Sequence, residues 1–199
     1  MDISWLGDNS FRINDDVIDV IVNPNNKTVE QSTLTDNTVI VNTDLSNDFD
    51  TKLPEIDTPG EYEINGVSIH GVANSVIKDQ NRSISTCFRI ESRGLSVAVI
   101  GIIGSSFDSE ALSVLASSHA VLFSPENDNI DSEILANTIR SIEPRKIIIS
   151  GYDKTQNKSS KNLDAIIKVL GLKDFESRGK ASFTISNLGD SQEIIVLEN

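Results

Sequence analysis

The sequence has little of what thiol and metal chemistry requires, because its 199 residues include one cysteine and two histidines. The single cysteine, Cys87, excludes an intrachain disulfide. No apolar run approaches the roughly 20 residues that cross a bilayer, and the first residues lack the basic and apolar regions of a signal peptide. We therefore expect a cytoplasmic protein that has no membrane partner.

Basic residues are also scarce, since 17 Lys and Arg stand against 30 Asp and Glu and leave a net charge of −13. An acidic surface repels phosphate backbones, so nucleic acid is not expected as a partner. The simplest role of such a charge is solubility. The apolar fraction of 38% suits an ordinary globular domain of this length.

The first hundred residues consist of short β-type segments separated by turn signals. Asn65-Gly66 is the strongest signal, because this pair is typical of a type I′ hairpin turn. Pro59-Gly60 indicates a type II turn, in which glycine takes the positive φ angle. Residues 25–37 are polar and predict an exposed loop. Strands are predicted over residues 3–6, 10–13, 17–22, 39–41, 62–64, 67–69, 83–91 and 95–100.

The second half changes to helical periodicity. Helices are predicted over residues 108–117, 131–142 and 161–170, the last of them closed by Gly171. Strands are predicted over 120–123 and 145–150, and a last hairpin over 181–186 and 193–197.

Hairpins followed by β-α units predict an α+β fold, an αββα sandwich of two mixed β-sheets flanked by helices. We expect a single domain over residues 1–199, with mostly β-hairpins in 1–100 and β-α units in 101–199.

Two motifs carry a family resemblance. Residues 5–13 read Trp-Leu-Gly-Asp-Asn-Ser-Phe-Arg-Ile, and residues 59–63 read Pro-Gly-Glu-Tyr-Glu directly before the Asn65-Gly66 hairpin. The first resembles a Trp-Leu-Gly-His-Ser-Ser-Phe-Arg-Ile motif of the metallo-β-lactamase superfamily. The second resembles the branch of small hydrolases similar to ascorbate-phosphate lactonase, and it is the more specific of the two. The resemblance spans nearly the whole chain and implies the same sandwich fold.

The resemblance also implies where a di-metal site would lie. In the family, a buried strand ends in Thr-His-x-His-x-Asp-His, and here Val39–Asp50 stands in its place. Each family ligand position that can be aligned holds a different residue in this chain. These degenerate positions are Asp8, Thr43, Leu45, Asn47, Asp48, Ile102, Ser105 and Gly151.

Zinc prefers imidazole and thiolate ligands, and both histidines, His70 and His119, fall outside the aligned positions. We therefore expect no metal, no other cofactor and no catalytic residue, with Leu45 and Ile102 packing a closed former site. The alternative is a hard cation held by oxygen ligands, for which Asp8, Asp44 and Asp48 are the candidates.

Other catalytic motifs are missing as well. The sequence has no Gly-x-Ser-x-Gly elbow and no P-loop, and Cys87 lies in a predicted strand without a basic neighbour. The resulting hypothesis is a metal-free, non-catalytic member of the fold that works by binding or assembly, with a protein partner or a second copy. The alternative is a metal-dependent hydrolase of a small ester, lactone or phosphodiester, with a relocated or carboxylate-based site.

Overall fold

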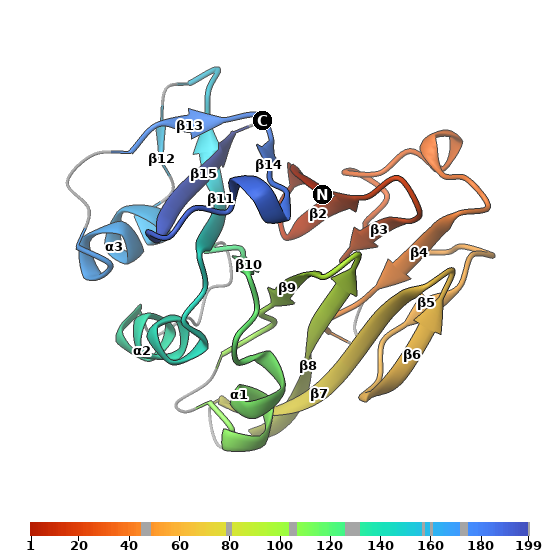
Figure 1. Cartoon of the computed structure of the whole chain (residues 1–199), viewed down its shortest axis with the longest axis horizontal. Coiled ribbons are helices and arrows are strands. Elements are labelled where there is room, and N and C mark those ends of the chain that lie inside the picture. Colours follow the sequence, from red (N-terminus) through yellow and green to blue (C-terminus); the bar gives the residue numbers. More distant parts are fainter. Residues whose placement is uncertain are drawn as a thin grey trace.

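Two β-sheets packed face to face form the centre of the computed structural model (Figure 1). The predicted α+β class with two mixed sheets is confirmed. The structure describes residues 1–44, 49–78, 81–103, 107–125, 132–156, 158–159, 161–171 and 175–198.

The first sheet has the strand order β14-β1-β2-β3-β4-β5. Its first four strands pair antiparallel, whereas β3, β4 and β5 run parallel. The strands are β1 (Asp2–Gly7), β2 (Ser10–Asn14), β3 (Asp19–Val22), β4 (Thr38–Val41), β5 (Glu55–Ile56) and β14 (Ala181–Ser182).

The second sheet has the order β13-β15-β11-β10-β9-β8-β7-β6, with β12 paired to β11. The strands from β6 to β9 form antiparallel hairpins, and those from β9 to β13 along this order are parallel. Its strands are β6 (Gly60–Ile64), β7 (Val67–Lys78), β8 (Asn81–Ser92), β9 (Leu95–Val99), β10 (Ala120–Phe123), β11 (Lys146–Asp153), β12 (Lys158–Ser159), β13 (Ser177–Arg178) and β15 (Glu193–Glu198).

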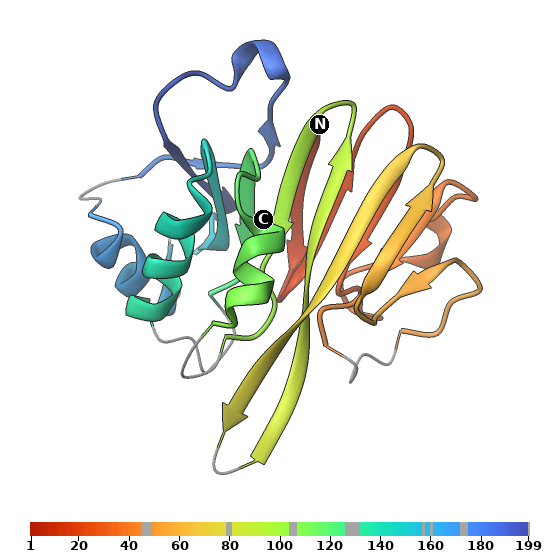
Figure 2. The same ribbon diagram turned by 60° about the horizontal axis from the view of Figure 1, so that its bottom comes forward.

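Two apolar layers hold this arrangement. Alternate side chains of both sheets meet in the central core, where Ile3, Phe88 and Leu122 are fully buried. The second layer lies between the second sheet and three helices, α1 (Ser109–Leu115), α2 (Ser132–Ile142) and α3 (Lys161–Val169). Figure 2 shows these helices side by side against the second sheet.

A loop rather than an α-helix covers the outer face of the first sheet in the described part of the chain. Val29 of this loop, which connects β3 to β4, and Phe49, which lies between β4 and β5, pack there against Ile21 and Ile40. The loop carries one 3-10 turn, η1 (Gln31–Thr33), because its Asn- and Thr-rich sequence forms side-chain turns instead of a helical ladder. None of the described helices is long and apolar enough to cross a membrane.

The glycine-containing turns agree only in part with the sequence. Asn65 and Gly66 have φ angles of 52° and 78°, so the predicted type I′ turn between β6 and β7 is confirmed. The prediction of a type II turn at Pro59-Gly60 is wrong. Gly60 has φ 159° and already pairs with Gly71 as the first residue of β6, whereas a type II turn needs about +80°.

The predicted hairpin over 181–186 and 193–197 is also wrong. β14 pairs with β1 in the first sheet, whereas β15 lies between β11 and β13 in the second. The residues between them form a 3-10 turn, η2 (Ile185–Asn187), whose N-cap Thr184 and Asn187 form a capping box. The connection therefore crosses between the sheets, which a two-residue turn signal at Gly189-Asp190 cannot reveal.

Candidate functional site

The candidate site lies at one edge of the sandwich, where strands of both sheets end. β3 and β4 are parallel, as are β9 and β10, and the residues that follow these strands meet across the two sheets. Asn23 follows β3, Thr43 follows β4, and Ser124 follows β10. We call this the carboxyl edge. It is where the family resemblance places the metal ligands.

Thr43 is fixed at this edge by bonds to both sheets. Its main-chain N–H and its hydroxyl both donate to Oδ1 of Asn23, at 2.8 and 3.1 Å. Its carbonyl accepts from the main-chain N–H of Thr86 and from the hydroxyl of Ser85, each at 2.9 Å. Only 4% of Thr43 is exposed, so its hydroxyl serves the fold instead of facing an open site.

Ser85 connects this junction to the end of β9. Its hydroxyl donates to the Thr43 carbonyl and accepts the main-chain N–H of Ile102 at 2.9 Å. Gly101 lies against it, because a Cβ atom at that position would stand 2.2 Å from Oγ of Ser85 and 3.0 Å from Cβ of Thr43. The close approach of the two sheets here requires glycine.

Ile102 differs from the expectation that it would be fully buried in a closed site. Its side chain is only partly buried, whereas the next residue, Ile103, is 0% exposed and packs in the layer beneath the helices. The main chain explains this, because the Ile102 carbonyl accepts from Nδ2 of Asn74 at 3.2 Å, opposite the bond to Ser85. Successive side chains on extended backbone point to opposite sides.

Asn74 and Asp108 extend the network toward α1. Asn74 is 0% exposed, and its Oδ1 accepts the main-chain N–H of Asp108 at 3.1 Å. Oδ2 of Asp108 accepts the main-chain N–H of Ser75 at 2.7 Å, so this carboxylate anchors β7 and does not cap the helix that it precedes.

The other degenerate positions that the structure describes, Asp8 and Gly151, lie near the same edge: the carbonyl of Asp8 accepts from the hydroxyl of Ser124 at 3.3 Å, and Gly151 follows Ile149, which pairs with Phe123 of β10. Asp8 is exposed with a φ of 46°, and its Oδ2 lies 3.5 Å from Nδ2 of Asn25. Gly151 has no side chain to offer and a φ of 108° within β11. Asp44 is partly buried. Leu45, Asn47, Asp48 and Ser105 lie outside the described residues.

A cavity of about 10 Å³ lies beneath these residues, between the two sheets. Asn9, Asn23, Thr43 and Ser124 line its polar side. This volume holds about one water molecule. Oδ1 of Asn9 is buried without a hydrogen-bond partner among the described residues, which makes it the acceptor that such a water would satisfy.

Both histidines lie away from this edge. His119 precedes the amino end of β10, where its Nδ1 accepts the main-chain N–H of Ser96 at 3.1 Å. His70 lies on β7, with Nε2 3.9 Å from Oε1 of Glu61. Across the described ranges, no group of three or more His, Cys, Asp or Glu side chains could hold a metal ion.

The donors that the described residues supply at the carboxyl edge therefore do not fit zinc. They are the hydroxyls of Thr43 and Ser85 and the amides of Asn23 and Asn74, all engaged in hydrogen bonds. Zinc sites are built instead from imidazole, thiolate and carboxylate groups. Asp8 supplies the one carboxylate of a degenerate position that the described residues place here, and it is exposed.

Cys87 is buried in the layer beneath the helices, as its strand position predicts. Burial raises the pKa of its thiol to about 12. The nucleophilic form of cysteine is the thiolate, so this side chain is inert at neutral pH.

Sequence reasoning missed the polar residues that now organise the edge. Asn23, Ser85 and Asp108 carry the junction, although no motif singles them out. The one available signal was position, since Asn23 ends a β-rich run just as Thr43 does. Their partners in this junction lie 17 to 42 residues away in sequence, so spacing could not pair them.

A family model described as a beta-lactamase superfamily domain matches residues 2–149, which include strands β1 to β10 and therefore Asn23, Thr43, Ser85 and Ser124 of the carboxyl edge. The chain belongs to the metallo-β-lactamase superfamily. Among curated proteins, none matches the chain.

Several solved structures share the fold of this chain. A protein of Thermotoga maritima, described as a proposed Zn-dependent hydrolase of the metallo-β-lactamase superfamily, has 19% identity and a TM-score of 0.75 over 100% of both chains. The metallo-β-lactamase fold protein YhfI of Bacillus subtilis has 6% identity and a TM-score of 0.59, with 98% of this chain and 95% of that chain covered. Human tRNase Z, short form, has 8% identity and a TM-score of 0.55, with 75% of this chain and 91% of that chain covered.

Proposed function

We propose that this chain is a metal-free, non-catalytic member of the superfamily, from the branch that resembles ascorbate-phosphate lactonase. It acts by binding or assembly, with a protein partner or with a second copy of itself. We further infer that residues 1–199 form one domain, which the shared central core supports, since Ile3 and Leu197 both belong to it.

The observation that carries this proposal is the junction of Thr43, Asn23 and Ser85. A side chain at a family ligand position is here occupied in hydrogen bonds that join the two sheets. Gly101 lets the sheets approach so closely that a cavity of about 10 Å³ remains. A hydrolase of this fold needs ligands with free lone pairs and room for a substrate beside them.

Metal analysis of the purified protein tests the proposal. We expect less than about 0.1 equivalents of zinc, iron or manganese per chain, because the aligned ligands are replaced. Neither EDTA nor added ZnCl₂ should shift the melting temperature, since no binding energy is linked to folding. A superfamily enzyme with an intact His motif, purified in parallel, is the control. One tightly held equivalent of transition metal would contradict the proposal.

The carboxylate-based hydrolase remains the second candidate, and the exposed carboxylate of Asp8 at the carboxyl edge favours it. Magnesium, calcium and manganese accept such oxygen ligands. The assay is hydrolysis of p-nitrophenyl acetate, a γ-lactone and bis(p-nitrophenyl) phosphate with each cation. Cation-dependent turnover that disappears in Asp8→Asn would establish this function. Turnover that Asp8→Asn leaves unchanged would come from another source.

A further inference from the structure

A second cavity, of about 620 Å³, opens at the end of the sandwich opposite the carboxyl edge. β9 runs from Leu95, which lines this cavity, to Val99, which lines the small cavity of the carboxyl edge. The cavity is lined by Met1, Asp2, Asn14, Asp15, Asp16, Arg93, Leu95, Thr184, Ile185 and Ser186. Its volume is within the range of small-molecule sites.

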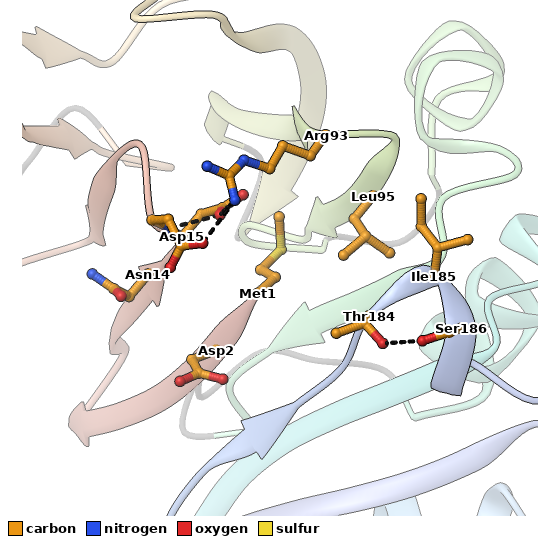
Figure 3. A pocket seen from close by; sticks show the side chains of 10 residues that line it. Met1, Asp2, Asn14, Asp15, Arg93, Leu95, Thr184, Ile185 and Ser186 are labelled. Atoms are coloured by element: carbon orange, nitrogen blue, oxygen red, sulfur yellow. Dashed lines mark hydrogen bonds and ion pairs between the residues drawn. The ribbon is translucent and has the colours of Figure 1, made fainter.

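The apolar part of the lining includes an exposed side chain. Ile185, in η2, is 62% exposed, one of two large hydrophobic side chains that stand out on the described surface. Figure 3 shows it facing the space that Leu95 and Met1 border. Its Cδ1 lies against the turn that carries Arg93 and Gly94, because a Cβ on that glycine would be 3.3 Å away. A bound apolar group would remove Ile185 from water.

The charged part of the lining holds the carboxylates of Asp2, Asp15 and Asp16, the guanidinium of Arg93, and the α-ammonium of Met1, which donates to the carbonyl of Phe183 at 3.0 Å. Arg93 uses one nitrogen, Nη1, for both Asp16 at 2.7 Å and Asp15 at 3.7 Å. The Asp16 side chain is 85% exposed and can accept a second donor. Asp2 bonds to Nζ of Lys180 at 2.7 Å, which lowers the pKa of its carboxyl and keeps it ionised at neutral pH.

We propose that this cavity binds a small organic cation, an ammonium group attached to an aliphatic or aromatic body. The body covers Ile185 and Leu95, and the ammonium group faces the carboxylates of Asp16 and Asp2. The net charge of −13 favours cations over anions at long range. The proposal goes beyond the proposed function and is independent of it, because the two sites lie at opposite ends and the probes below bind without metal.

Three probes of matched size test the charge preference: phenethylammonium, 2-phenylethanol and 3-phenylpropanoate. Each is titrated into ¹⁵N-labelled full-length protein and followed by amide chemical shifts. We expect phenethylammonium to shift Leu95, Ile185 and Arg93 and to bind at least about tenfold more tightly than 3-phenylpropanoate. Equal affinity for all three probes would overturn the cation class. No shift at Leu95 and Ile185 up to about 10 mM probe would overturn the site.

Four variants then separate the contribution of apolar contact from that of charge. Ile185→Ser should weaken all probes about fivefold through lost apolar contact, whereas Asp16→Asn should weaken only phenethylammonium, by about threefold. Ile84→Ser, which changes an equally exposed isoleucine on β8, and Asp36→Asn, an exposed aspartate on another cavity, are the matched controls. Affinity that is unchanged in Ile185→Ser, or lowered equally by the controls, would contradict the proposal.

Discussion

Gly101 is the residue on which the closeness of the two sheets depends. A methyl group there would stand 2.2 Å from Oγ of Ser85 on the neighbouring strand β8 and 3.0 Å from Cβ of Thr43 in the first sheet, so Gly101→Ala must displace Ser85 and press against the first sheet. We expect a loss of about 1–3 kcal/mol in the free energy of unfolding, measured by urea denaturation. Gly179→Ala is the control, because nothing lies within 4 Å of its Cβ position. If Gly101→Ala left the free energy of unfolding unchanged, the residues around Gly101 would have to move aside at little energetic cost.

A substitution at Gly66 tests backbone strain alone, because a side chain there would meet no neighbouring atoms. Its Cβ position is open, but its φ of 78° belongs to a region that side chains with a Cβ atom occupy poorly. Gly66→Val should therefore destabilise the chain by about 1 kcal/mol or more in the same urea experiment. An unchanged denaturation midpoint would argue against the type I′ turn.

Cys87 provides a probe of opening in the second sheet. With its thiol 0% exposed and its pKa raised to about 12, it should react with Ellman's reagent at pH 8 only after local or global unfolding. The reaction should be slow in buffer and complete within the mixing time in urea. Fast reaction of the native protein would place the thiol at an accessible surface.

At the scale of elements, we expect the contact between β11 and β15 to depend on pH. The hydrogen bond from Lys146 is the main cause that lowers the pKa of Glu193 below its ordinary 4.5. Because the pKa is lower in the folded state, the Glu193 carboxylate stabilises the fold fully above its unfolded-state pKa of about 4.5. This contribution is lost as the pH falls from there through the folded-state pKa. Glu193→Gln should cost no more than about 1 kcal/mol at pH 7 and nothing at pH 2, by thermal unfolding. An equal cost at both pH values would assign the effect to packing.

Local signals predicted elements well where the signal and the partner are adjacent in sequence. Asn65-Gly66 located the turn of its hairpin, although β7 runs to Lys78 and not only to residue 69, and the apolar spacing of 161–170 agreed with α3 to within one residue. The pairing of β14 with β1 could not be predicted, because a two-residue strand whose partners are 178 and 180 residues away leaves no periodic pattern. The same holds for the candidate site. The family motif located Thr43, but its hydrogen bonds to Asn23 and Ser85 could not be predicted from the sequence.

At the scale of the whole molecule, the charge of −13 opposes the compact state through self-repulsion. Added salt screens this repulsion, since the Debye length falls from about 30 Å at 0.01 M to about 8 Å at 0.15 M. We expect the melting temperature to rise by about 2–4 °C when NaCl increases from about 10 to 150 mM, which corresponds to about 1 kcal/mol. A fall with salt would mean that the ten or so described ion pairs outweigh the repulsion.

The position of β15 has a consequence for how the chain is made. This strand is inserted between β11 and β13, where Val196 and Leu197 are fully buried. β14 closes the other sheet only after residue 181 is available to β1. A ribosome synthesising this chain would therefore release the last interior strand after nearly everything around it has emerged. The nascent chain must keep a gap in its second sheet until that moment, and a product that ends early exposes two unpaired strand edges to chaperones and proteases.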